Sequence, residues 1–300
     1  MTAQEYKQFA GVYALMLTPY NDDLSVDWET YKAYTEFQAA TGVGHLFAVC
    51  GTSEMSALTI DEREKLARLT VQYASGTPVV ATANMEPSWF AQVEEVKRMS
   101  QTGVCGLIFT TKGMHDDPDR QFTYLNELAQ YTDLPLFLYE FPGFRPHKME
   151  ADVYKRLVDT GRFVGIKDTT CHLQDIAEKI AVQGDSNVLQ ANIPLLFEAW
   201  KAGARGVMAT PTSCGAQLFQ KMWDSFTAGD LKAAEEMNRN ITLLDFAIDS
   251  GFNVSAKFLI QLQGVRGMKP INRFGVTLDE ARVQSLRTYY DWAKANGLAY

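Results

Sequence analysis

The chain has 300 residues, of which 46% are hydrophobic, and it carries a formal net charge of -8 at pH 7. This is enough to bury a large core, as one large barrel or two ordinary domains. The acidic balance and the lack of any Lys/Arg-rich stripe argue against nucleic-acid binding. No apolar run is long enough to predict a transmembrane helix, and the amino terminus lacks the basic-then-apolar layout of a signal peptide. We therefore expect a globular, cytoplasmic protein that binds neither nucleic acid nor membrane.

The cysteines argue against a metal site. They stand far apart, with no CxxC pair and no histidine at ligand spacing, at Cys50, Cys105, Cys171 and Cys214. This pattern predicts reduced, mostly buried thiols rather than disulfides or metal ligands.

Short apolar runs alternate with longer amphipathic stretches as far as residue 215. We expect strands at residues 12–18, 45–50, 79–83, 106–110, 134–139, 163–167, 187–191 and 206–210. Between them, apolar residues at helical spacing predict helices such as 27–41, 61–75, 88–102 and 149–160. Several of these stretches end at a glycine suited to a left-handed helix cap, namely Gly42, Gly76, Gly103, Gly161 and Gly203.

Eight such strand–helix units predict a (β/α)₈ TIM barrel. The strands are nearly continuously apolar, as parallel strands covered on both faces should be. A doubly wound open sheet is the alternative, but no GxGxxG follows the first strand. Beyond the barrel the pattern is helical only, at residues 216–228, 230–250, 254–264 and 278–296. We therefore expect a catalytic barrel over residues 1–215 and a C-terminal helical region over residues 216–300 packed on it.

The candidate catalytic residues lie where the predicted strands end, which is where TIM barrels place their active sites. Lys167 closes the apolar run 163–166, and burial favours the neutral, nucleophilic form of a lysine. Tyr139 closes the preceding strand, so its phenol could relay protons beside an imine on Lys167. The small residues Gly51, Thr52 and Ser53 form a loop whose amides and hydroxyls suit a carboxylate.

Each of these residues also has a structural interpretation. Lys167 could reach solvent from a strand end, and Tyr139 could be a core tyrosine with a satisfied hydroxyl. Thr52 could cap a helix that begins near Glu54. For Glu54 itself we prefer the role of a first-turn acid favoured by the helix dipole.

The ordered set of motifs resembles the dihydrodipicolinate synthase / N-acetylneuraminate lyase family of class I aldolases over essentially the whole chain. The motifs are TPY at 18–20, CGTSE at 50–54, SALTIDER at 56–63, YEFP at 139–142 and GIKD at 165–168. The spacing of 28 from Tyr139 to Lys167 and the all-helical C-terminal extension also match the family.

The resemblance implies a lyase that binds a pyruvate-type 2-oxo acid as an imine on Lys167. Tyr139 would relay protons, and the substrate carboxylate would lie on the loop of Gly51, Thr52 and Ser53. The protonated imine acts as an electron sink, so no metal or other cofactor is required. The reaction would be aldol cleavage or condensation with an aldehyde, or dehydration, of a 3-deoxy-2-oxo sugar acid. Members of the family are commonly tetramers built from dimers, so a homotetramer is expected, with a dimer as the alternative.

The chain differs from the family pattern at several positions that, in the family, face the distal half of the substrate. Lysine-biosynthesis members carry Pro-Tyr-Tyr after strand four, whereas this chain has TKGMH at 111–115 and lacks that tyrosine. Gly51 stands where those enzymes have a second hydroxyl, and QAN at 190–192 replaces a frequent Gly-Asp pair. Glu140 replaces the usual Asn, and it is expected to bind substrate or to pair with Arg145. Arg145, at a slightly shifted position, is a candidate for binding a distal carboxylate or hydroxyl.

Asp168, next to Lys167, could hold a partner at the base of the site or be a buried structural carboxylate. His115 and Lys112, after strand four, are more consistent with subunit contact or solvation than with catalysis.

We favour cleavage of a 3-deoxy-2-oxo sugar acid because the strand-four tyrosine is missing. One alternative is 4-hydroxy-tetrahydrodipicolinate synthase, which joins pyruvate to aspartate semialdehyde. Another is a non-catalytic homologue that binds a 2-oxo acid. A barrel isomerase without an imine would leave Lys167 without a role.

Overall fold

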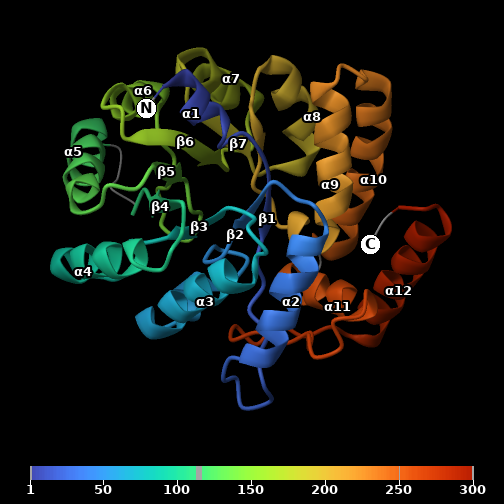
Figure 1. Ribbon diagram of the computed structural model, residues 1–300. Coiled ribbons are helices and arrows are strands. Elements are labelled where there is room, and N and C mark those ends of the chain that lie inside the picture. Colours follow the sequence, from blue (N-terminus) through green and yellow to red (C-terminus); the bar gives the residue numbers. More distant parts are fainter. Residues whose placement is uncertain (1, 113–116, 250, 299–300) are drawn as a thin grey trace. The chain divides into compact units, whose positions relative to one another are not determined.

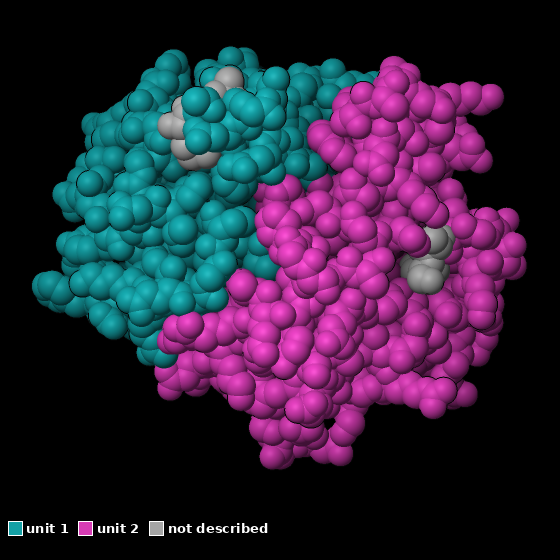
Figure 2. All heavy atoms as spheres, viewed as in Figure 1, with its two compact units in different colours: residues 1–11, 79–208 teal, residues 12–78, 209–300 magenta. Residues whose placement is uncertain are grey.

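A computed structural model describes residues 2–112, 117–249 and 251–298. The chain forms two compact units, residues 1–11 with 79–208 and residues 12–78 with 209–300 (Figure 2). The strands follow one another as a closed barrel in the order β1 to β8. Figure 1 labels β1 to β7 among the helices. They are β1 (Gly11–Leu15), β2 (His45–Phe47), β3 (Val79–Thr82), β4 (Gly106–Thr110), β5 (Leu136–Tyr139), β6 (Phe163–Asp168), β7 (Asn187–Gln190) and β8 (Gly206–Val207). The predicted (β/α)₈ barrel is confirmed.

The first unit contains the parallel ladder from β3 to β8. Every residue of β3 to β8 is buried, because parallel strands are covered on both faces. Its α-helices are α1 (Ala3–Lys7), α4 (Trp89–Ser100), α5 (Pro118–Leu128), α6 (Ala151–Asp159), α7 (Leu173–Val182) and α8 (Ile193–Ala202). A short 3₁₀ helix, η2 (Ala129–Tyr131), follows α5.

The second unit contains the parallel pair of β1 and β2. Its α-helices are α2 (Trp28–Ala40), α3 (Ile60–Tyr73), α9 (Thr212–Thr227), α10 (Leu231–Asp249), α11 (Asn253–Leu262) and α12 (Glu280–Ala295). A 3₁₀ helix, η1 (Met55–Ala57), precedes α3. The helices α10 to α12 form a C-terminal extension of the fold. The extension expected from the sequence also included residues 216–228, which overlap α9.

Differences from the expected elements are confined to their ends. The last strand stops at Val207 rather than at residue 210, and α9 begins at Thr212 rather than at residue 216. Pro211 precedes α9 with φ -61°, a value that a helix start accepts readily. The five glycines expected to end helices all have positive φ, as predicted. Ser250, the last residue of one expected helix, lies outside the described residues.

Within the described ranges, no helix combines the length and the apolar character that a membrane crossing requires.

Candidate active site

Lys167 and Tyr139 face one another on adjacent strands of the first unit. They are partners in the register of β5 and β6, and each side chain is only 4% exposed. The Nζ atom of Lys167 lies 4.3 Å from the centroid of the Tyr139 ring. The electron-rich face of a phenol attracts an ammonium group at this distance. The structure therefore brings together the two residues for which the sequence predicts a shared catalytic role.

The residue that follows each of them points to the opposite side, because side chains alternate along an extended chain. There the buried carboxylates of Glu140 and Asp168 meet Lys179, which reaches them from α7. The Nζ atom of Lys179 lies 2.9 Å from Oε1 of Glu140 and 2.9 Å from Oδ2 of Asp168. We call these three residues the ion cluster.

Backbone amides and a hydroxyl complete the bonding of the two carboxylates. Glu140 accepts hydrogen bonds from the amide of Met149 at 2.8 Å and from the amide of Thr169 at 3.2 Å. Asp168 accepts bonds from the amide and the hydroxyl of Thr170, at 3.1 and 2.8 Å. Asp168 is thus a buried structural carboxylate, which was one of its two expected roles.

The ion cluster shifts the protonation equilibria of its members. Burial raises the pKa of Glu140 to about 7, an effect that Lys179 partly offsets. Burial alone lowers the pKa of Lys179, but the two carboxylates beside it outweigh this and raise the pKa overall. Lys179 therefore stays protonated, and the charge of Glu140 changes near neutral pH.

The expected pairing of Glu140 with Arg145 is wrong. The carboxylate of Glu140 is fully buried and bonds to Lys179 and to backbone amides, whereas the Arg145 side chain is exposed. Strand alternation explains this, because it turns Glu140 away from the face that Tyr139 occupies. The same geometry argues against a direct substrate contact for Glu140, since its carboxylate would first have to leave Lys179.

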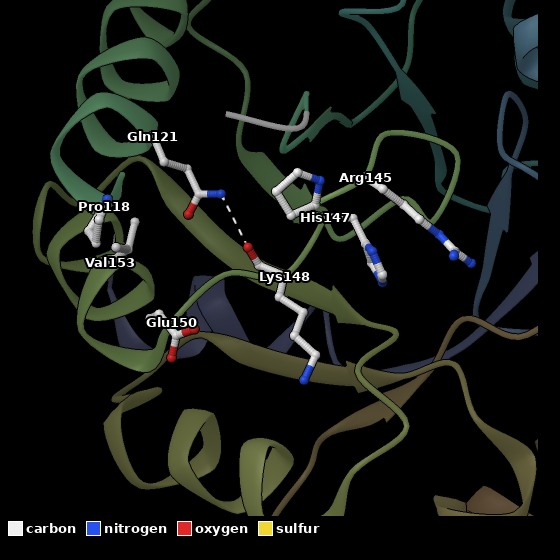
Figure 3. A pocket seen from close by; sticks show the side chains of 8 residues that line it. Pro118, Gln121, Arg145, His147, Lys148, Glu150 and Val153 are labelled. Carbon is white, nitrogen blue, oxygen red and sulfur yellow. Dashed lines mark hydrogen bonds between the residues drawn. The ribbon is translucent and has the colours of Figure 1, made fainter. Parts of the chain in front are cut away.

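Arg145 lies in the loop between β5 and α6 and lines a cavity of about 480 Å³ (Figure 3). His147 and Lys148 line the same cavity, and the Arg145 and His147 side chains extend to the same side of it. Burial, together with the nearby Arg145 and Lys148 charges, lowers the pKa of His147, so this imidazole is neutral at pH 7. Lys148 pairs with Asp175 at 2.7 Å, in an exposed position.

The loop at residues 50–54 belongs to the second unit. Its side chains mainly hold its own shape: the Ser53 hydroxyl accepts a bond from the Cys50 amide at 2.7 Å and donates to the Ala48 carbonyl. The Thr52 hydroxyl lies 3.0 Å from that of Thr210, so the expected helix-cap role for Thr52 is not observed. Two backbone hydrogen bonds close the turn: the Glu54 amide donates to the Gly51 carbonyl, and the Met55 amide donates to the Cys50 carbonyl.

The amides of Gly51, Thr52 and Ser53 make no backbone hydrogen bond within the described part of the chain. Glu54 follows them with φ +65°, in the left-handed region. A run of amides ending at such a residue forms a concave group of donors that suits an anion.

The expectation that Glu54 is a first-turn acid is wrong. Glu54 is 1% exposed, and its Oε1 lies 2.7 Å from Nζ of the buried Lys257. Its Oε2 accepts a bond from the Arg273 amide at 2.8 Å. The helix that follows Glu54 has only three residues, and α3 begins later with Thr59 as its cap, so Glu54 meets no long helix dipole.

Sequence reasoning missed Lys179 and Lys257 because both lie on helices, away from the strand ends. A signal was present for Lys179: it stands three residues after the buried Ile176 and so lies on the same helix face. Lys257 lies in α11, where every residue from Asn253 to Ile260 is buried, and a charged residue in such a run predicts a buried partner.

Two expectations concern the loop after β4. Residues 113–115, including His115, lie outside the described residues. Lys112 is described, and its Nζ donates to the carbonyls of Met85 and Glu86, both at 3.0 Å. Among the residues that the structure describes, no group of three or more His, Cys, Asp or Glu side chains is arranged to hold a metal ion.

A sequence profile of the dihydrodipicolinate synthetase family matches residues 8–287. The chain belongs to this family. The family resemblance predicted from the motifs is thereby confirmed, and so is the expectation of an enzyme of the lyase class.

Three members of the dihydrodipicolinate synthetase family illustrate the similarity. A 4-hydroxy-tetrahydrodipicolinate synthase of Shewanella pealeana is 26% identical over 233 residues, which cover 77% of this chain and 79% of the relative. The structure of a monomeric dihydrodipicolinate synthase variant aligns with a TM-score of 0.88 at 23% identity, covering 98% of this chain and 99% of that one. YagE, a prophage protein from E. coli K12 solved in complex with pyruvate, aligns with a TM-score of 0.87 at 21% identity, covering 97% and 99%.

The raised pKa of Glu140 predicts a pH-dependent stability. A carboxyl group with a pKa of 4.5 in the unfolded chain and about 7 in the folded chain stabilises the fold below pH 4.5 and loses that contribution as the pH rises through 7. Glu140→Gln should remove this decline, which amounts to about 3 kcal/mol. Urea unfolding between pH 4.5 and 8 measures it. The exposed Glu150→Gln should keep the wild-type slope, and an unchanged slope in Glu140→Gln would contradict the assignment.

Proposed function

We propose that this enzyme forms an imine between Lys167 and the keto carbon of a pyruvate-type 2-oxo acid. The observation that supports it most is the buried lysine amine 4.3 Å from the ring of Tyr139, at paired positions of two parallel strands. A buried amine beside a phenol has both a nucleophile and a proton carrier, which imine chemistry requires.

The similarity to relatives supports pyruvate as the 2-oxo acid. YagE was solved with pyruvate bound. The Shewanella pealeana relative carries the name of 4-hydroxy-tetrahydrodipicolinate synthase, an activity that joins pyruvate to an aldehyde. In our proposal the amides of Gly51, Thr52 and Ser53 bind the substrate carboxylate, because they are oriented donors without a backbone acceptor. Ser53 contributes only its backbone, since its hydroxyl is used within the loop.

The chemistry follows from the imine. The Lys167 amine adds to the C2 carbonyl, and water leaves. The protonated imine accepts the electron pair of the breaking C3–C4 bond, while the C4 hydroxyl loses its proton and becomes the carbonyl of the aldehyde product. The enamine is then protonated at C3, and water releases pyruvate and regenerates the amine. Tyr139 carries the protons, and no metal or cofactor takes part in these steps.

For the distal half of the substrate we propose a 3-deoxy-2-oxo sugar acid that is cleaved or formed by aldol chemistry. The support is the sequence at 111–115, which lacks the tyrosine of the lysine-pathway enzymes. Arg145 offers an exposed guanidinium to a distal carboxylate or hydroxyl. The name of the relative supports a second candidate, the condensation of pyruvate with aspartate semialdehyde. The division at residue 215, a homo-oligomeric assembly and a cytoplasmic location stay predictions.

Incubation with pyruvate and borohydride should add one reduced pyruvate to the protein, on Lys167. Reduction converts the imine to a stable amine, so intact-mass and peptide mass spectrometry detect it. Lys167→Ala should give no adduct while keeping the wild-type circular dichroism spectrum. The exposed Lys148→Ala is the matched control and should be trapped like the wild type. Absence of the adduct from the wild-type protein would overturn the imine mechanism.

Tyr139→Phe should lower turnover by about 10²-fold, the range typical of a lost proton relay, while some trapping with borohydride persists. The ring that packs beside Lys167 is kept, so the change isolates the hydroxyl. Pyruvate release in a coupled assay measures turnover. If Tyr139→Phe turns over at the wild-type rate, Tyr139 has no part in the mechanism.

A substrate panel distinguishes the candidate reactions. We expect pyruvate release from at least one 3-deoxy-2-oxo sugar acid, and turnover at least about tenfold slower with pyruvate and aspartate semialdehyde. Faster turnover with pyruvate and aspartate semialdehyde than with the sugar acids would favour the synthase. Trapping of pyruvate without turnover of any substrate would favour a non-catalytic binding protein.

A further inference from the structure

The ion cluster and the proposed catalytic pair occupy opposite faces of the same two strand ends. Tyr139 and Glu140 are consecutive, and so are Lys167 and Asp168. Lys179 contacts both carboxylates at 2.9 Å, so a single ammonium group joins the end of β5 to the end of β6. Thr169 adds to this connection, because its amide donates to Oε2 of Glu140 and its hydroxyl donates to the Glu140 carbonyl.

The backbone ladder between β5 and β6 is irregular at one end and ends in a long hydrogen bond at the other. The pairing of β5 with β6 is irregular between Leu136 and Phe137, where the register shifts. At the other end, the amide of Glu140 donates to the Lys167 carbonyl at 3.4 Å, which is long for an N–H···O bond. A change of register by one residue would turn Tyr139 or Lys167 to the opposite face. Contacts beyond the ladder that join the two strand ends would help to keep the pair opposed.

Stability alone does not readily explain the ion cluster, because burying charged groups costs free energy. Three charged groups are removed from water, and an apolar packing of the same volume is often as stable or more so. Buried ionic groups are better explained where they specify one arrangement of the chain. Here the arrangement that the cluster specifies is the alignment of β5 with β6.

We propose that Glu140, Asp168 and Lys179 are positioning residues for catalysis, which hold the ends of β5 and β6 so that Tyr139 stays opposite Lys167. This rests on the proposed function, since it assigns the cluster to the imine-forming step. None of the three contacts the substrate. Glu140 and Asp168 act through the backbone of the residue that precedes each of them, and Lys179 acts through their carboxylates.

The test compares Lys179 variants in the borohydride reaction with pyruvate, with rates expressed per folded molecule. Lys179→Met should lower the limiting trapping rate at least about tenfold and leave the half-saturating pyruvate concentration within about twofold. The carboxylate-binding amides at residues 51–53 are untouched, so only the reacting pair is disturbed. Lys179→Arg keeps a cation between the carboxylates and should retain most of the rate.

Two controls separate positioning from stability. Leu157→Ala opens a cavity in the buried face of α6 without touching the cluster, and it should destabilise the protein but keep the trapping rate. The double variant Glu140→Gln/Lys179→Met removes one buried carboxylate along with the cation and so keeps the variant folded if Lys179→Met alone fails to fold. Positioning predicts that the double variant stays slow, because the connection between the strands is missing.

Hydrogen exchange of the Glu140 amide gives a readout that does not depend on catalysis. This amide bonds to the Lys167 carbonyl across the two strands, so its exchange should accelerate in Lys179→Met and in the double variant but not in Leu157→Ala. Wild-type trapping rates and unchanged Glu140 exchange in the double variant would overturn the positioning role while leaving the imine proposal intact. A wild-type protein that forms no adduct would overturn both.

Discussion

The alternation of side chains at the ends of β5 and β6 is the constraint on which the rest of the site depends. It sends Tyr139 and Lys167 to one face and Glu140 and Asp168 to the other. Neither pair can move without the other, because adjacent residues share a peptide bond. The geometry of the reacting pair on one face therefore depends on how the carboxylates on the other face are packed. A substitution that looks remote from the substrate can then alter the geometry of the reacting groups.

Three lysines in the described part of the chain are buried, and their surroundings differ. Lys179 and Lys257 each lie within 3 Å of a carboxylate, which offsets at least part of the loss of hydration. Lys167 lies against the face of a phenol ring. An amine that attacks a carbonyl must be neutral, and a phenol beside it can carry the proton. The position of Lys167 thus matches the chemistry proposed for it.

The barrel, the strand ends and the Tyr139–Lys167 pair could be predicted from the sequence because they follow from local patterns. Apolar runs identify strands, and the end of a strand determines where its last side chain lies. The roles of Glu140 and Glu54 could not be predicted in the same way. Each depends on a lysine far along the chain, Lys179 or Lys257, whose approach is decided by helix packing. A sequence pattern shows that a carboxylate is buried, but only the packed fold shows its partner.

The ion cluster also bears on how the distal half of the substrate is recognised. The carboxylate of Glu140 is bound to Lys179. The same carboxylate accepts the amide of Met149, at the base of the loop that carries Arg145 and His147. Glu140 therefore fixes one end of this loop. Since Arg145 extends from the loop beside a cavity, we expect the loop to discriminate among substrates, with Glu140 acting on specificity only through the backbone that it anchors.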